Sequence, residues 1–412
     1  MMTSKKPEDN PNSGNQSPSA LDGLRVLDIS RLVAGNMLSL QLADFGADVI
    51  KVEPLPAGDT LRSWKDDGHP FYWKVYGRNK RSLALNFRQS GSIELLTHLI
   101  SEADILLESF RPGTLEKMQL DPETLIEKFP QLIVIRISGF GQTGPYSHKP
   151  GFGTLMEAMS GFASRNGFAD REPVLPPMPL ADMISGLYGA YATMVALRNR
   201  DRNDGRGQII DLSLMQSMMS VLSADVAINQ STGQIKPRLG SGSNQAGPRG
   251  VYRTKDEKWV AISASTQNSA MRFLELIGGE ELTRDPRFLE NSGRVKYRSE
   301  LDQLINDWMS GKTRAEALET VDQAGVTAGP VYDASEILDD PHVQDTNVFF
   351  SSPDPEIGTL YSHSPTPRLS RSPGQVELSA PSLGQHTAEI LKEAGFSDTE
   401  IGQFIESGLV GV

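Results

Sequence analysis

The chain of 412 residues contains no cysteine. Disulfide bonds, thiolate catalysis and cysteine-ligated zinc or iron–sulfur sites are therefore excluded. Its six histidines are scattered without metal-site spacing, and no Gly-x-Ser-x-Gly elbow is present. A zinc centre or a serine triad thus has no support, and we predict that no metal is bound. A chain without cysteine is compatible with a reducing compartment, so we expect a cytoplasmic protein.

Positive charge and long apolar runs are also scarce. There are 40 Lys and Arg against 52 Asp and Glu, a formal net charge of −12. We therefore expect no nucleic-acid partner, and an anionic ligand must be held by a local basic patch. Residues 1–19 are polar and are typical of a disordered tail, not of a signal peptide. The weakly charged stretch 173–197 contains four prolines and Asp182, which argues against a membrane span.

The first part of the chain alternates between two apolar patterns. Strand-like runs at 24–30, 48–53, 82–87, 104–110 and 132–138 are separated by helical patterns at 37–47, 92–103 and 122–129. This alternation predicts an α/β fold with a parallel, doubly wound sheet, which is a Rossmann-like large domain. The chain is too long for one ordinary core, so a second domain is expected.

The pattern changes after residue 232. A glycine- and serine-rich loop at 238–250 precedes a hairpin that turns at 255–257, followed by helical patterns near 267–277, 299–310 and 313–324. We predict a smaller α+β domain there. The predicted organisation is a tail (1–19), the large domain (20–200), a linker helix (201–232), the small domain (233–330), a Pro- and Ser-rich linker (331–375) and a C-terminal part that completes the large domain (376–412).

Three loops could carry chemistry, and each has a structural alternative. The first βα turn, "ISRLVAGNM", lacks G-x-G-x-x-G, so it is either part of another kind of site or only a turn. The basic segment 74–81, beside aromatic residues, could hold phosphates and stack a base, or form a solvated edge. The glycine-rich loop 138–153 lets backbone N–H groups approach a ligand, or is a plain crossover.

Asp182 is the only charged residue between Glu172 and Arg198. Taking an isolated carboxylate out of water is costly, so its apolar surroundings need an explanation. A helical pattern starts directly after Asp182, so a helix N-cap is one interpretation. Pairing with an unseen cation is another.

Ten motifs stand in a characteristic order along the chain: "LDGLRVLDISRLVAG", "FGADVIKVEP", "GDTLRSW", "NKRSLALN", "ESFRPGTLEKM", "SGFGQTGPY", "PLADMISGLYGA", "GRGQIIDLSL", "GVTAGPV" and "LGQHTAEIL". With these motifs the chain resembles the family III CoA-transferases from about Leu21 to its end. That group includes formyl-CoA transferase, carnitine CoA-transferase and, as a side branch, α-methylacyl-CoA racemase.

The resemblance implies that Asp182 is the nucleophile of a CoA transfer from an acyl-CoA to a free carboxylic acid. In the transferases this Asp forms an aspartyl–acyl anhydride and then an aspartyl-CoA thioester. CoA and acyl-CoA are substrates, and no permanently bound cofactor is implied. The resemblance also implies a homodimer of two chains threaded as interlocked rings. Apolar neighbours would keep water from the anhydride, and the same burial would raise the pKa of Asp182.

Other roles are carried over by position. By this match, the residues that fall where family members hold the CoA nucleotide are Lys51, Asn79, Lys80, Arg81 and Lys117. Those near the pantetheine and the reacting centre are Val33, Ala34 and Arg111. A glycine-rich lid over the Asp in formyl-CoA transferase matches "GSGSNQAG", with Gly240, Gly242 and Gln245 as its candidate lid and oxyanion residues.

Two departures bear on specificity. Racemases have a His followed by Asp where this chain has Phe152 and Gly153, which favours a transferase. A racemase or isomerase that uses Asp182 as a base, and a CoA-binding protein without chemistry, stay as alternatives. Val33 replaces a Gln of formyl-CoA transferase, so formate and oxalate are not expected as substrates. The acid is left open between short dicarboxylates and branched aliphatic acids.

Overall fold

The computed structural model describes residues 19–222 and 224–412. The tail predicted at 1–19 lies outside these residues, apart from Ser19. The described chain divides into two compact units. Unit 1 contains 19–160, 176–222 and 348–412, and unit 2 contains 161–175 and 224–347.

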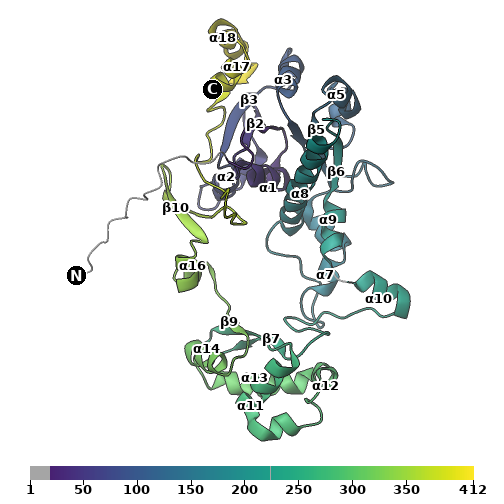
Figure 1. Cartoon of the computed structure of the whole chain (residues 1–412), viewed down its shortest axis with the longest axis vertical. Coiled ribbons are helices and arrows are strands. Elements are labelled where there is room, and N and C mark those ends of the chain that lie inside the picture. Colours follow the sequence, from purple (N-terminus) through teal and green to yellow (C-terminus); the bar gives the residue numbers. More distant parts are fainter. Residues whose placement is uncertain (1–18, 223) are drawn as a thin grey trace, which may run out of the picture. The chain divides into compact units, whose positions relative to one another are not determined.

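Unit 1 is built on a seven-stranded sheet with the order β12-β3-β2-β1-β4-β5-β6 (Figure 1). The strands are β12 (Val410–Gly411), β3 (Lys80–Leu85), β2 (Asp48–Pro54), β1 (Arg25–Asp28), β4 (Ile105–Glu108), β5 (Ile133–Ser138) and β6 (Ile209–Ser213). The strands from β3 to β6 pair in parallel, and β12 pairs antiparallel with β3. The predicted parallel sheet is confirmed, and the chain end adds one antiparallel edge strand.

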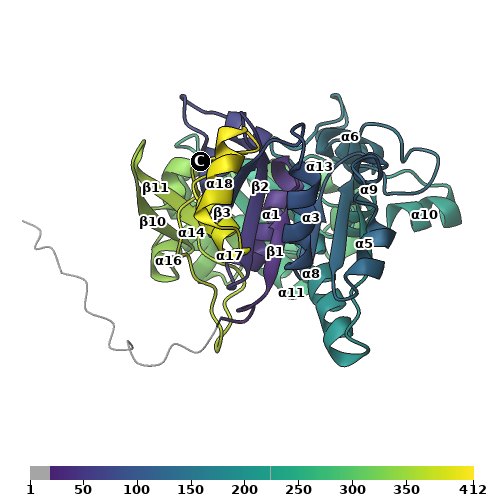
Figure 2. The ribbon, with the colours of Figure 1, turned by 90° about the horizontal axis from the view of Figure 1, so that it is seen from above.

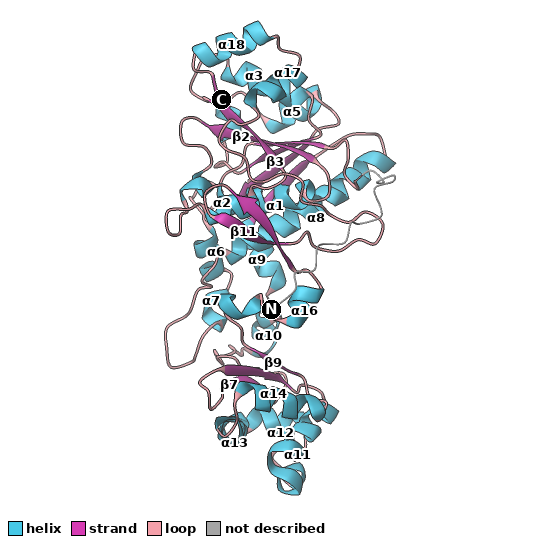
Figure 3. Cartoon of the chain, turned by 90° about the vertical axis from the view of Figure 1, so that its left-hand side faces the viewer, coloured by secondary structure: helices cyan, strands magenta, loops and turns pink. Residues whose placement is uncertain are grey.

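Helices cover both faces of this sheet (Figure 3). One face packs against α3 (Ser92–Ser101), α4 (Thr114–Lys117), α5 (Pro122–Lys128), α17 (Thr387–Glu393) and α18 (Asp398–Glu406). The other face lies against α1 (Leu32–Ala43) and α8 (Leu180–Arg202). Figure 2 shows the yellow C-terminal helices beside β2 and β3, so the two chain ends build one unit.

Strand alternation separates an apolar face from a partly polar one. Leu27, Ile50 and Leu83 belong to the core beneath α3 and α17. Successive side chains of a strand point to opposite faces, so the neighbouring Asp28 and Lys51 face α1. These two residues are register partners on adjacent strands, and both are fully buried. A charged pair therefore sits inside unit 1, at the carboxyl ends of its central strands.

Unit 2 is a smaller α+β fold. Its antiparallel sheet has the order β7 (Arg249–Arg253), β8 (Trp259–Ser263) and β9 (Ala328–Pro330). The sheet packs with α11 (Gln267–Arg284), α13 (Arg298–Ser310) and α14 (Arg314–Gln323) around buried Phe273, Phe288 and Met309. The hairpin and the three helices occur where the sequence pattern predicts them.

Two segments predicted as linkers contain regular structure. Segment 331–375 holds α15 (Ala334–Ile337), α16 (Pro341–Asp345) and a hairpin of β10 (Phe349–Asp354) and β11 (Gly358–His363). Segment 201–232 contributes β6 and α9 (Leu214–Val221) to unit 1 and α10 (Asp225–Thr232) to unit 2. The many Pro and Ser residues of 351–374 concealed the hairpin, because composition does not report strand pairing.

Among the residues that the structure describes, one helix, α8, is long and apolar enough to cross a membrane by length and composition alone. In unit 1 it packs against α1, α9 and the sheet. This packing explains its small residues: Gly186 and Gly189 lie where a Cβ would meet Met37 and Leu38 of α1.

Candidate active site

The strand order reverses between β1 and β4. The chain runs from β1 to β2 and β3 on one side, then crosses to β4 and β5 on the other. Doubly wound sheets bind ligands beyond the carboxyl ends of the strands at such a reversal. A cavity of about 320 Å³ lies there. Its lining includes the turn after β1 (Arg31, Leu32, Ala34), the segment after β4 (Ser109, Phe110, Arg111), the loop after β5 (Lys149, Gly151, Phe152) and Asp182.

Asp182 is the third residue of α8, and the N-cap position belongs to Pro179. The N-cap interpretation of Asp182 is therefore wrong, although its charge still lies in the first helical turn, where the helix dipole favours an anion. Burial raises the pKa of Asp182 to about 6, and the charge of Glu157 adds to the rise, while its own backbone N–H lowers it. The structure thus provides a half-desolvated carboxylate at the wall of a cavity.

Two features of α6 (Gly153–Met159) hold this carboxylate in place. Buried Glu157 accepts a hydrogen bond of 3.0 Å from the backbone N–H of Ala181, the residue before Asp182. A Cβ at Gly153 would collide with the Asp182 carboxylate. The first helical turn of α8 is therefore anchored by Glu157, and a side chain at position 153 would force the Asp182 carboxylate to move.

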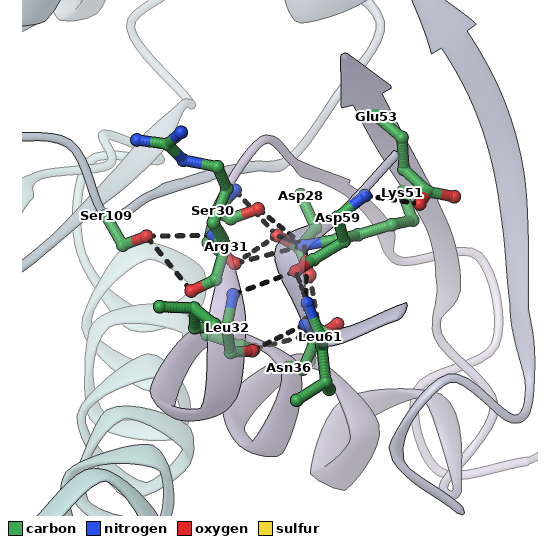
Figure 4. A network of polar contacts seen from close by, with 12 residues as sticks. Asp28, Ser30, Arg31, Leu32, Asn36, Lys51, Glu53, Asp59, Leu61 and Ser109 are labelled. Atoms are coloured by element: carbon green, nitrogen blue, oxygen red, sulfur yellow. Dashed lines mark hydrogen bonds and ion pairs between the residues drawn. The ribbon is translucent and has the colours of Figure 1, made fainter. Parts of the chain in front are cut away.

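A buried ionic cluster lies beneath the turn after β1 (Figure 4). The Lys51 ammonium is 3.0 Å from Asp28, 3.1 Å from Asp59 and 2.7 Å from the Ser30 carbonyl. Burial alone would lower the pKa of Lys51, but the two carboxylates outweigh it and raise the pKa. A fully buried ammonium with these partners presents no surface to a phosphate, which argues against the predicted contact of Lys51 with CoA.

The cluster fixes an unusual backbone. Leu32 has φ +64°, a left-handed conformation that costs free energy for a side chain such as Leu. Its N–H donates to Asp59 at 3.0 Å, and Asn36 donates to the same carboxylate at 2.8 Å. Asp59 therefore holds the turn that lines the cavity, and Lys51 holds Asp59.

Three other predicted nucleotide-binding residues are also engaged within the protein. Lys80 is fully buried and donates to the side chain and carbonyl of Asn36, and burial lowers its pKa to about 7. Asn79 bonds Asp44 and the backbone of 377–378. Arg81 pairs with Asp48 and Glu393. These contacts argue against direct binding of CoA by Asn79, Lys80 and Arg81.

The wider basic segment 74–81 is neutralised in the same way. Lys74 pairs with Asp354 at 2.7 Å, and Arg78 pairs with Asp44 at 2.6 Å. Both pairs are largely buried. Neither the phosphate-binding interpretation nor the solvated-edge interpretation describes this segment, because its cations join distant parts of unit 1.

The three residues predicted near the reacting centre, and Lys117 from the predicted nucleotide site, divide into three groups. Ala34 and Arg111 line the cavity together with Asp182. Val33 instead packs into a buried cluster with Leu61 and Trp73. Lys117 ends α4, is exposed, and forms no ion pair with a described residue. Ala34 and Arg111 therefore lie where a substrate bound beside Asp182 would lie.

The predicted lid residues belong to unit 2, whereas Asp182 belongs to unit 1. Gly240 has φ +57°, and its N–H donates to the Gly167 carbonyl at 2.8 Å. The Gly242 N–H donates to Leu239, and the Gln245 carbonyl accepts from Asn291. The loop is thus ordered by its own unit, and its role as a lid stays a prediction.

Three charged residues of this region were missed from the sequence. Arg31 and Lys149 line the cavity, and Glu157 anchors α8. Arg31 and Lys149 follow β1 and β5 in the chain, so a search for charge beyond each predicted strand would have found them. Glu157 had no such signal, because its partner Ala181 is 24 residues away.

Comparison with known proteins identifies the family. A family model described as CoA-transferase family III matches residues 21–387. Succinyl-CoA--D-citramalate CoA-transferase of Chloroflexus aurantiacus is 38% identical, over 92% of this chain and 95% of that protein. Succinyl-CoA:glutarate CoA-transferase of Homo sapiens is 30% identical, over 97% of this chain and 92% of that protein. The crystal structure of a CAIB/BAIF family protein from Brucella suis is 32% identical with a TM-score of 0.81, covering 92% of this chain and 100% of that one. The chain belongs to the family III CoA-transferases.

Proposed function

We propose that this enzyme moves CoA from succinyl-CoA, or a similar acyl-CoA, to a free carboxylic acid, with Asp182 as the nucleophile. The observation that carries the proposal is the Asp182 carboxylate, which lines the cavity at the reversal point of the sheet and has a pKa raised to about 6. The names of the relatives support succinyl-CoA as donor, because several of them name succinyl-CoA as a substrate.

The proposed steps exchange acyl bonds without a redox change. An Asp182 oxygen attacks the thioester carbon, the C–S bond breaks, and CoA thiolate leaves an aspartyl–acyl anhydride. The thiolate then attacks the Asp182 carbonyl carbon and releases the donor acid as its carboxylate. The acceptor carboxylate attacks the resulting aspartyl-CoA thioester and expels the thiolate again. The thiolate finally attacks the acceptor acyl carbon, which forms the new acyl-CoA and restores Asp182.

The surroundings of Asp182 suit this chemistry. A pKa of about 6 leaves the carboxylate mostly ionised at pH 7, as a nucleophile must be. A carboxylate must expel a thiolate of much higher ordinary pKa, so the tetrahedral oxyanion needs preorganised donors. Burial limits the water that would hydrolyse the anhydride.

Binding of CoA is assigned to cations that the protein leaves available. Arg111 lines the cavity. Lys117 is the last residue of α4, and it is exposed and forms no ion pair among the described residues. Gly240, Gly242 and Gln245 are retained as a lid over the site. If the lid closes during turnover, Gly242→Pro should lower kcat more than it lowers the affinity for CoA.

We further propose a homodimer. Four apolar residues of α8 are exposed in the single chain: Leu187, Tyr191, Met194 and Val195. Their spacing places them on one helical face, and Met219 and Val221 of α9 are exposed as well. A contiguous apolar face of this kind is typical of a protein–protein interface. The interlocked arrangement rests on the family resemblance.

The racemase or isomerase alternative is disfavoured by Gly153. A Cβ at this position would force the Asp182 carboxylate to move, so the acidic residue that racemases carry there would displace the carboxylate from the position it has here. Exchange of solvent deuterium into the α-carbon of an acyl-CoA, without an acceptor acid, would support that alternative instead. A CoA-binding protein without chemistry would keep all its functions in Asp182→Ala.

The direct test is a transfer assay with succinyl-CoA and a panel of free acids. We expect ping-pong kinetics, new acyl-CoA for at least one acid, and no transfer by Asp182→Asn. Transfer by Asp182→Asn at the wild-type rate would reject Asp182 as the nucleophile.

A further inference from the structure

The cavity beside Asp182 is lined by cationic side chains that form no ion pair with a described residue. Arg31, Arg111 and Lys149 line it, and none of the three pairs with a carboxylate of the described residues. Most other arginines near the sheet are paired, as Arg78 and Arg81 are. In a chain of net charge −12, unpaired cations that converge on one cavity indicate an anionic ligand.

These cations stand apart from the nucleophile. No ion pair joins any of them to Asp182, and the pKa of Asp182 is raised by burial and by Glu157 without an opposing cation. The cavity therefore offers a carboxylate nucleophile at one position and free positive charge at another. A ligand that carries its reacting carbon and an anionic group at opposite ends would match both.

The backbone of Arg31 is held by hydrogen bonds on either side of its side chain. Its N–H donates to the Ser109 hydroxyl at 2.9 Å, and the next residue, Leu32, is fixed in its left-handed conformation by Asp59. In Figure 4 the Arg31 guanidinium points away from the buried ionic cluster. It lies 5.5 Å from the centre of the Phe110 ring, which also lines the cavity.

The other two cations fit this role less well. The Lys149 ammonium lies 3.7 Å from the Tyr146 ring and is a point charge on a flexible stem. Arg111 falls near the pantetheine by the family match, so it would serve every acyl-CoA alike. A guanidinium offers a planar pair of donors that binds a carboxylate in a bidentate manner, which gives Arg31 the better geometry for recognition.

We propose that Arg31 binds the carboxylate of the substrate that does not react, so that this site selects dicarboxylic acids and their mono-CoA thioesters. The inference rests on the proposed CoA transfer. In the first half-reaction Arg31 would hold the free carboxylate of the donor acyl group. In the second it would hold the distal carboxylate of the acceptor, while the other carboxylate attacks the aspartyl-CoA thioester.

The test compares dicarboxylic and monocarboxylic substrates of equal length in Arg31→Gln. With succinyl-CoA and glutarate we expect kcat/KM to fall about 10- to 100-fold, the range for loss of a charge-assisted hydrogen bond. With butyryl-CoA and pentanoate, which lack the second carboxylate, the change should stay below about threefold. Arg31→Lys keeps the charge without the planar pair of donors and should lie between wild type and Arg31→Gln.

Arg111→Gln is the matched control, because it removes a second guanidinium of the same cavity. It should affect succinyl-CoA and butyryl-CoA equally. An equal loss for both classes of substrate in a folded Arg31→Gln protein would overturn the inference and assign Arg31 to CoA itself. Unchanged kcat/KM for both classes of substrate in Arg31→Gln would overturn it as well.

Failure of the proposed function has a different signature. If wild type transfers CoA between no pair of substrates, CoA transfer is rejected, and the Arg31 inference is decided by calorimetric binding of succinate and butyrate. Tighter binding of succinate than butyrate by wild type, lost in Arg31→Gln, supports it. Equal binding of the two acids by wild type rejects it.

Discussion

At the scale of single residues, the pKa of Asp182 is set by desolvation and by the charges around the carboxylate. Burial and, to a smaller extent, the charge of Glu157 raise its pKa to about 6. Only the ionised form can attack a thioester, so kcat/KM should increase with pH and level off above an apparent pKa near 6. Below this pH the carboxylate is protonated and the rate should fall tenfold per pH unit.

Glu157→Gln tests the cause of that pKa. The amide oxygen can still accept the Ala181 N–H, but the negative charge is gone. The pKa of Asp182 should therefore decrease, and the acidic limb of the kcat/KM profile should move to lower pH. The measurement is the transfer rate from pH 4.5 to 8 for both proteins. An unmoved limb would show that Glu157 does not act on Asp182.

The sequence singled out Asp182, which lines the cavity, and also Lys51 and Lys80, which are fully buried. An isolated carboxylate among apolar neighbours is visible in one stretch of sequence. Lys51 and Lys80 look like ligand-binding cations in the sequence, because the residues that pair with Lys51 or accept from Lys80 are 8 to 44 positions away. Their register on adjacent strands, which buries them, appears only once the sheet is formed.

At the scale of elements, the turn between β1 and α1 depends on a buried ionic cluster. Lys51→Met should destabilise the protein by about 3–5 kcal/mol, because it leaves Asp28 and Asp59 buried without their cation. Lys117→Met, at an exposed position of α4, should change the free energy of unfolding by less than about 0.5 kcal/mol. Urea unfolding of both variants is the measurement. Similar stabilities for the two would contradict the structural role of Lys51.

The contact between α6 and α8 gives a second prediction at this scale. Gly153→Ala adds a methyl group that collides with the Asp182 carboxylate. A displaced nucleophile can cost on the order of 100-fold in rate, so we expect kcat/KM to fall by at least tenfold without unfolding.

Gly402→Ala in α18 is its matched control. A Cβ at Gly402 meets no atom within 4 Å, so activity should be unchanged and stability should rise by about 0.5–1 kcal/mol. Equal activity in the two variants, measured by steady-state transfer, would show that the missing side chain at Gly153 does not position Asp182.

Element types were predictable because periodicity is local. The strands of the parallel sheet and most of the longer helices occur where apolar spacing places them, whereas short helices such as α6 were not predicted. The β10–β11 hairpin was missed because proline and serine dominate its composition and its pairing is not visible in either strand alone. The cavity was not predictable, since three separate loops converge only through the strand order.

At the scale of the whole molecule, the exposed apolar face of α8 predicts self-association. Tyr191 is 66% exposed in the single chain, with Met194 and Val195 beside it on the helix face. Tyr191→Asp combined with Met194→Asp should shift the protein from dimer to monomer in sedimentation velocity experiments. Val412→Asp places the same charge at an exposed apolar chain end and should leave the dimer intact. A monomeric wild-type protein would contradict the proposed assembly.

The central claim is that Asp182 becomes covalently linked during CoA transfer. Wild-type enzyme is incubated with succinyl-CoA in the absence of acceptor acid, treated with hydroxylamine and digested with trypsin. Residues 172–198 form the tryptic peptide that contains Asp182. If Asp182 is linked covalently, we expect a hydroxamate on Asp182 in this peptide. It should form only when succinyl-CoA is present, and it should be absent from Asp182→Asn. An unmodified peptide from an enzyme that transfers CoA, or a hydroxamate on another residue, would contradict it.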